Sequence, residues 1–260
     1  MIPKVIHYCW FGGNPLPEMA EKCIESWKKF CPEYEIRRWD ESNFDVNCCT
    51  YVKQAYEAKK WAFVSDYARF KILYDHGGLY FDTDVELIRP IDDLVEKGPF
   101  MGVEKYEADG TPMVAPGLGL ATRPEAPLYQ ELMQAYHERA FYDSNGNLNL
   151  VTIVAYTTEI LKKHGLRNDR QIQRLGDVCI YPPEYFCPKD MLTCELTVTE
   201  NTRSIHHFDG TWYNEEGQYA LALKRKFARM LPCRIGGILA TALAKVKYQG
   251  VVACVKWILK

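Results

Sequence analysis

The stretch Ser65–Glu86, reading S-D-Y-A-R-F-K-I-L-Y-D-H-G-G-L-Y-F-D-T-D-V-E, constrains the fold more than any other part of the sequence. It carries aromatic residues at helical spacing, which predicts an α-helix. Gly77 and Gly78 then end the helix, because glycine accepts the left-handed backbone that helix ends often need. The apolar run 79–81 predicts a buried strand. The aromatic stripe consists of Phe63, Tyr67, Phe70 and Tyr74.

Two carboxylates, Asp82 and Asp84, follow the predicted strand. Side chains alternate along a strand, so residues two apart point to the same side. We therefore expect the two carboxylates to converge on one point, where a divalent cation that prefers oxygen ligands can bind. On the helix before them, Asp66 and Arg69 are one turn apart and share a polar face. The ordinary alternatives are a solvated turn for the first pair and a surface ion pair for the second.

Bulk properties narrow the class of protein. A chain of 260 residues can bury a full core as one domain, or as one domain with an appendage. The net charge of −2 gives no indication of nucleic-acid binding. The ten cysteines include no Cys-x-x-Cys pair, which favours free thiols in a reducing compartment over a zinc site. The N-terminal residues lack the pattern of a secretory signal, so we expect a cytoplasmic protein.

The order of predicted elements gives the fold class. Strands and helices alternate from Lys4 to Tyr181, as in an α/β sheet domain. The character changes at 218–260, which is rich in Lys and Arg and contains no acidic residue. We therefore predict a domain at 1–217 and a segment of basic amphipathic helices at 218–260. Such helices either lie on an anionic membrane surface or pack on the domain with a solvated basic face.

The pattern S-D-x-x-R-x-x-x-L-x-x-x-G-G-x-Y-x-D-x-D resembles glycosyltransferase family 32, which includes the yeast initiating α-1,6-mannosyltransferase and bacterial capsular polysaccharide enzymes. It is more distantly similar to the catalytic domain of the clostridial glucosylating toxins. The opening I-P-K-V-I-H-Y-C-W-F-G-G also resembles the first strand of the family. The resemblance implies a GT-A type, Rossmann-like mixed sheet flanked by helices, here followed by the basic C-terminal segment.

The resemblance also implies roles for individual residues. Asp82 and Asp84 would hold Mn²⁺ or Mg²⁺, with Asp82 bridging the metal and the ribose. Imidazole is a suitable third ligand, which implies His207, or His206 as the alternative because neighbouring strand residues face opposite ways. Trp10 would stack on the base, although a core role is equally compatible with its spacing. The implied catalytic set is Asp66, Arg69, Asp82 and Asp84, and the implied donor-binding set is Trp10, Asp66, Arg69, Tyr80, Asp82 and Trp212.

The implied function is metal-dependent, retaining transfer of a sugar from a UDP- or GDP-linked donor. The acceptor would be a saccharide or a lipid-linked glycan in surface polysaccharide synthesis, at the inner face of the membrane. One alternative is a haloacid-dehalogenase-like phosphohydrolase, because Leu79–Val85 also resembles the first motif of that superfamily and would make Asp82 a nucleophile. A non-catalytic carbohydrate-binding relative is the other. The sequence leaves the donor, the acceptor, the linkage and the oligomeric state open.

Overall fold

The computed structural model describes residues 1–210 and 213–258, apart from the side chains at 233 and 234. The chain forms two compact units. The first, which we call the sheet unit, comprises Met1–Pro188 and Val198–His206, and the second, the helical unit, comprises Lys189–Thr197 and His207–Lys260. The boundary predicted between 217 and 218 falls inside helix α8 (Glu215–Ala228), because the basic composition starts later than the helical unit does.

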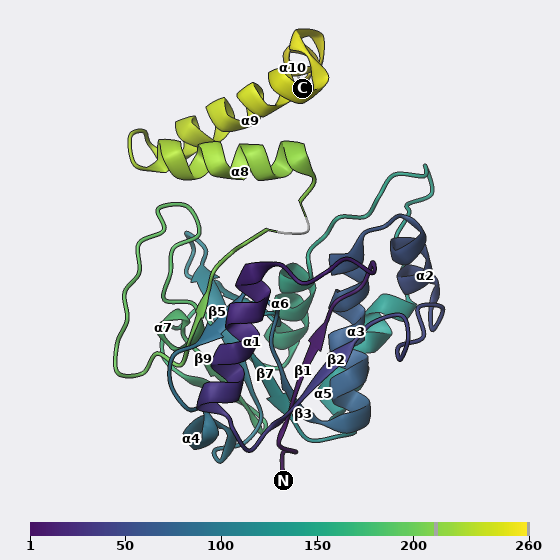
Figure 1. The fold of residues 1–260 in the computed structure, drawn as a ribbon, viewed down its shortest axis with the longest axis vertical. Helices are drawn as coiled ribbons and strands as arrows, with labels where there is room; N and C mark the ends of the chain where they lie inside the picture. The colour runs from purple at the N-terminus through teal and green to yellow at the C-terminus, as the bar shows by residue number, and fades with distance from the viewer. Residues whose placement is uncertain (211–212, 259–260) are drawn as a thin grey trace. The chain divides into compact units, whose positions relative to one another are not determined.

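The sheet unit is built on a mixed sheet, so the predicted fold class is confirmed (Figure 1). Its strand order is β2-β1-β3-β7-β5-β9-β8, and β6 pairs with β5. The pairs β2–β1, β1–β3 and β5–β9 are parallel, whereas β3–β7, β7–β5 and β8–β9 are antiparallel. A separate antiparallel pair joins β4 and β10. The strands are β1 (Val5–Cys9), β2 (Glu35–Trp39), β3 (Gly78–Tyr80), β4 (Val85–Leu87), β5 (Phe100–Tyr106), β6 (Pro112–Val114), β7 (Leu120–Thr122), β8 (Gln173–Leu175), β9 (Val178–Tyr181) and β10 (Ser204–His206).

Strand alternation divides the core between the two faces of this sheet. On one face, the rings of Tyr8 and Phe81 lie 5.8 and 5.7 Å from the ring of Trp27 on helix α1 (Glu18–Phe30). On the other face, Cys9 and Tyr80 belong to a core cluster that includes residues of α3 and α5. The remaining helices of this unit are α2 (Thr50–Glu57), α3 (Trp61–His76), α4 (Asp92–Val95), α5 (Pro127–His137), α6 (Ile153–Lys163) and α7 (Pro183–Phe186).

Helix α3 is enclosed on almost all sides. Tyr67 and Phe70 of the predicted aromatic stripe are buried, as expected. Asp66 and Arg69 are buried as well, so the predicted polar face is internal and the surface ion pair is wrong for this site. The helix ends at His76, and Gly77 follows with φ of 63°, a conformation in which any other residue would be strained.

The helical unit contains α8 (Glu215–Ala228), α9 (Cys233–Gln249) and α10 (Val251–Ile258), so the predicted C-terminal helices are present. Helix α9 packs against both α8 and α10. Its exposed side chains include an apolar stripe, consisting of Ile235, Ile238, Leu239, Leu243 and Val246. Within the described residues, none of the helices has the length and apolar character needed to cross a bilayer.

Candidate active site

The two aspartates lie just beyond β3 rather than in it. The strand ends at Tyr80, and Thr83 and Asp84 form a turn. Strand alternation, on which the expected convergence of the carboxylates was based, therefore does not apply to them. The backbone N–H of Asp82 instead donates to the carbonyl oxygen of Gly117 at 2.9 Å, and the N–H of Val85 donates to the carbonyl of Asp82 at 3.1 Å. These bonds fix the turn from both sides.

The buried guanidinium of Arg69 holds the carboxylate of Asp82. Arg69 is only 4% exposed. Its two terminal nitrogens lie 3.3 Å from Oδ2 and 3.2 Å from Oδ1 of Asp82, a fork geometry that fixes the plane of the carboxylate. Nη2 also lies 3.1 Å from Oδ1 of Asp66, so one cation serves two carboxylates. The Tyr80 hydroxyl donates to Oδ1 of Asp82 at 3.1 Å, and Arg69 stacks over the Tyr80 ring.

Burial changes the proton affinity of Asp66. Burial raises the pKa of this carboxyl group, Arg69 lowers it and the charge of Asp82 raises it, and the net result is a pKa of about 7. The rise outweighs the ion pair because a single guanidinium is shared with Asp82. Asp66 is therefore a group that changes protonation near neutral pH within the site.

This pKa predicts a pH-dependent stability. Because the folded-state pKa of Asp66 exceeds its usual value of 3.8, the folded protein holds a proton that the unfolded chain has released. The free energy of unfolding should therefore decrease as pH rises from about 4 to about 7, by at most about 1.4 kcal/mol per pH unit. Asp66→Asn should remove this decrease. Urea denaturation at pH 5, 6, 7 and 8 measures it, with Asp75→Asn, which alters an exposed carboxylate of the same helix, as the control. Parallel pH profiles for the wild type and Asp66→Asn would contradict the assignment.

Asp84 lies beside a different cation. Strands β4 and β10 pair with Val85 opposite His206, and this brings His206 Nε2 to 3.3 Å from Asp84 Oδ1. Burial lowers the pKa of His206, but Asp84 and Cys187 raise it well above its usual value. The structure thus places the alternative ligand, His206, at Asp84. His207 belongs to the helical unit, so its role as a metal ligand stays a prediction.

Trp10 lies at the same edge of the sheet as Asp82. Strands β1 and β3 are parallel neighbours, with His7 opposite Tyr80. Trp10 and Asp82 each follow the carboxyl end of one of these strands. Ligands of open α/β sheets bind at such edges. Trp10 is half-buried and its indole N–H donates to the carbonyl of Asn14 at 2.7 Å, so it is not a core residue. Trp212, which was predicted to bind the donor, lies outside the described residues.

Two functional candidates were missed from the sequence. Gly117 lies in the loop between β6 and β7, and a Cβ there would be 1.9 Å from Oδ2 of Asp82. The apolar run 114–122 is typical of a strand in the sequence, although the glycines in P-G-L-G indicate a close backbone approach. Glu104 on β5 is the other: burial raises the pKa of its carboxyl group, and the charge of His206 opposes the rise.

The segment that contains the two aspartates matches a family of known proteins. Residues 17–101 match the family model described as "Glycosyltransferase sugar-binding region containing DXD motif". This segment contains Asp66, Arg69, Asp82 and Asp84. Residues 17–101 are thus similar to a glycosyltransferase sugar-binding region. The predicted resemblance is therefore confirmed for the segment that carries the DXD motif.

Relatives of the sugar-binding region are named as glycosyltransferases. An uncharacterized glycosyltransferase of Acanthamoeba polyphaga mimivirus is 27% identical over 143 residues, which are 52% of this chain and 55% of that protein. Inositol phosphoceramide mannosyltransferase 1 of Schizosaccharomyces pombe is 28% identical over 111 residues, covering 38% of this chain and 33% of that protein. The chain thus spans about half or less of these relatives. Among solved structures, PaToxG glycosyltransferase has a TM-score of 0.46 at 19% identity, over 62% of this chain and 69% of that one.

Proposed function

We propose that the protein transfers a sugar from a nucleotide-sugar donor to a glycan acceptor, with retention of anomeric configuration. The observation that carries this proposal is the buried network in which Arg69 holds Asp82 and Asp66 at the carboxyl edge of the sheet. Because Arg69 fixes the plane of the Asp82 carboxylate, the remaining lone pairs of this carboxylate point in one direction. The sugar-binding region that contains it supports a sugar nucleotide as the ligand.

The side chains of Asp82 and Asp84 suit Mn²⁺ or Mg²⁺, because these cations prefer oxygen ligands. The Asp82 side chain is 32% exposed, so its carboxylate is accessible. Among the described residues, no three His, Cys, Asp or Glu side chains are grouped to hold an ion. This agrees with a cation bound by one or two carboxylates together with substrate phosphates, as is usual for Mg²⁺. Such a cation would neutralise the negative charge of the departing diphosphate.

The protein's own residues would then position the donor. Trp10 offers an aromatic plane to the base at the end of β1, and its indole bond to Asn14 fixes the ring. Asp66 would accept hydrogen bonds from sugar hydroxyls, and it does so best when ionised, above its pKa of about 7. Arg69 acts through Asp82, since its nitrogens are already occupied by two carboxylates and the Ser65 carbonyl.

The proposed activity is tested with the purified full chain and a panel of UDP- and GDP-linked sugars, with Mn²⁺, with Mg²⁺ and with chelator. We expect diphosphate release from at least one donor, dependent on the cation. Asp84→Asn should abolish it, and Asp75→Asn, an exposed carboxylate outside the site, should not. Failure of every donor in the presence of Mn²⁺ would support the non-catalytic carbohydrate-binding alternative.

We further propose that the helical unit contacts an anionic membrane surface, one of the two placements that the basic composition left open. The apolar stripe of α9 is exposed, and α10 adds further exposed apolar residues. Lysines adjoin these residues along both helices, which suits a helix lying at the surface of an anionic bilayer. Such contact would fit a lipid-linked acceptor in capsular or other surface polysaccharide synthesis. The exposed apolar residues of α10 are Val251, Val252, Val255 and Ile258.

Flotation with liposomes tests the membrane contact. Ile238 and Leu243 are both about half exposed, at 50% and 47%. The double variant Ile238→Asn, Leu243→Asn should float at least about fivefold less with anionic vesicles, because two apolar anchors are lost. Ile172→Asn, which replaces an equally exposed apolar residue of the sheet unit, should float as the wild type does. Equal flotation of all three proteins would contradict the proposal.

A further inference from the structure

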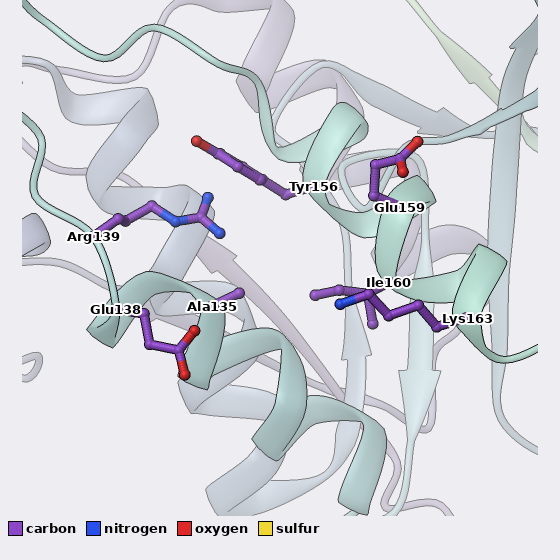
Figure 2. A pocket seen from close by; sticks show the side chains of 7 residues that line it. All are labelled: Ala135, Glu138, Arg139, Tyr156, Glu159, Ile160 and Lys163. Carbon is purple, nitrogen blue, oxygen red and sulfur yellow. The ribbon is translucent and has the colours of Figure 1, made fainter.

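A cavity of the sheet unit lies between α5 and α6. Its volume is about 340 Å³, near the lower end of small-molecule pockets. Arg139, which follows α5, stacks against Tyr156 of α6 in its lining, while the Lys163 amine points back toward the gap (Figure 2). None of the residues that line it takes part in the network around Asp82.

Arg139 has the geometry of an anion-binding residue. Its guanidinium carbon lies 3.2 Å from the centre of the Tyr156 ring and 4.9 Å from that of Tyr136. Stacking uses the faces of the guanidinium and leaves its N–H edge, which is preorganised for bidentate binding of an oxyanion. Nη1 is buried and has no hydrogen-bond partner in the described part of the protein. A buried donor in this state is stabilised when a ligand oxygen accepts from it.

The charges around the cavity suit a ligand that is both acidic and hydroxylated. Glu159 is paired with Lys162 at 2.8 Å, and Glu138 accepts from Gln134 at 3.1 Å. Neither Arg139 nor Lys163 forms an ion pair with a carboxylate in the described residues, so the two uncompensated cations are available to an oxyanion. Carboxylate oxygens of Glu138 remain as acceptors for hydroxyl groups.

Two aromatic rings separate Asp66 from the residues that line the cavity. The ring of Tyr67, next to Asp66 on α3, lies 5.8 Å from that of Tyr136 on α5. Tyr136 in turn lies 6.1 Å from Tyr156. Burial raises the pKa of Tyr136, and the charges of both Asp66 and Arg139 act on it. The cavity and the network around Asp82 are therefore joined by packed, buried rings.

We infer that the cavity between α5 and α6 binds an acidic sugar, bearing a carboxylate or a phosphate. Arg139 and Lys163 bind the acidic group, and Glu138 accepts from ring hydroxyls. This binding does not rest on the proposed transferase function.

Direct binding to the full chain tests this inference by titration calorimetry at constant ionic strength, without any nucleotide sugar. The probes are glucuronate, glucose 6-phosphate, glucose and inorganic phosphate. We expect glucuronate or glucose 6-phosphate to bind at least about tenfold more tightly than glucose and inorganic phosphate, and which of the two binds identifies the acidic group. Arg139→Gln and Lys163→Gln should each weaken this binding by about tenfold, the loss of one charge-assisted hydrogen bond. Lys97→Gln removes the same charge from an exposed lysine of the sheet unit, outside the cavity lining, and should retain it.

Equal binding of glucose, equal binding of inorganic phosphate, no binding by the wild type, or binding unchanged in both variants would overturn the inference. Because the assay uses no donor, it can succeed where the transferase assay fails, and the reverse.

Discussion

Arg69→Met is expected to lower the free energy of unfolding by about 3–5 kcal/mol, the usual cost of removing one partner from a buried ion pair. Arg69 is the cation shared by Asp66 and Asp82, so its loss leaves two carboxylates without their partner. It also removes the stacking on Tyr80. Methionine fills similar apolar volume, and the loss is therefore mainly electrostatic.

The loss should depend on pH. At pH 5 Asp66 is already protonated, because burial raises its pKa to about 7, and this part of the penalty is absent. At pH 8 both carboxylates are charged, so the destabilisation should be larger. Urea denaturation at the two pH values measures this. The matched control is Arg123→Met, which breaks an exposed ion pair with Asp177 and should cost about 1 kcal/mol or less. If the two variants were equally stable, the network around Asp82 would not be the structural centre that we describe.

Gly117→Ala should reduce diphosphate release by about 100-fold or more while leaving the protein folded. The new Cβ would be 1.9 Å from Oδ2 of Asp82, so the carboxylate must move. A displacement of about 1 Å in a positioned group is enough for an effect of this size. The backbone of Gly117 does not have a positive φ, and alanine adds no conformational strain there.

The control for this variant is Gly237→Ala, where nothing lies within 4 Å of the added Cβ. It should keep full activity, and both proteins should give the wild-type circular dichroism spectrum. Wild-type activity in Gly117→Ala would show that the orientation of Asp82 does not matter for the reaction.

The sequence predicted the helix and strand around the site better than it predicted which of their residues are buried. The aromatic stripe and the glycine pair defined α3 and its end correctly, because local spacing and backbone geometry determine both. Periodicity does not show whether a second layer covers a polar face, so the burial of Asp66 and Arg69 could not be foreseen. Their ion pair was expected, but its sharing with Asp82 arises only when α3 packs on β3.

The histidines show a second limit. Adjacent residues of a strand point to opposite sides, and the sequence alone left His206 and His207 as alternatives. The pairing of β10 with β4 brings His206 to Asp84, and this pairing joins segments more than 100 residues apart. Gly117 was missed for the same reason, since its contact with Asp82 depends on the loop between β6 and β7.

The central claim is that Asp82 and Asp84 bind a divalent cation against the diphosphate of the donor. The most direct measurement is the anomalous difference density of crystals grown with Mn²⁺ and UDP or GDP. We predict a peak within coordination distance of a carboxylate oxygen of Asp84 and of the diphosphate, with Asp82 alongside, and no peak in Asp84→Asn. A bound nucleotide whose diphosphate carries no manganese, or a manganese ion remote from both aspartates, would contradict the account.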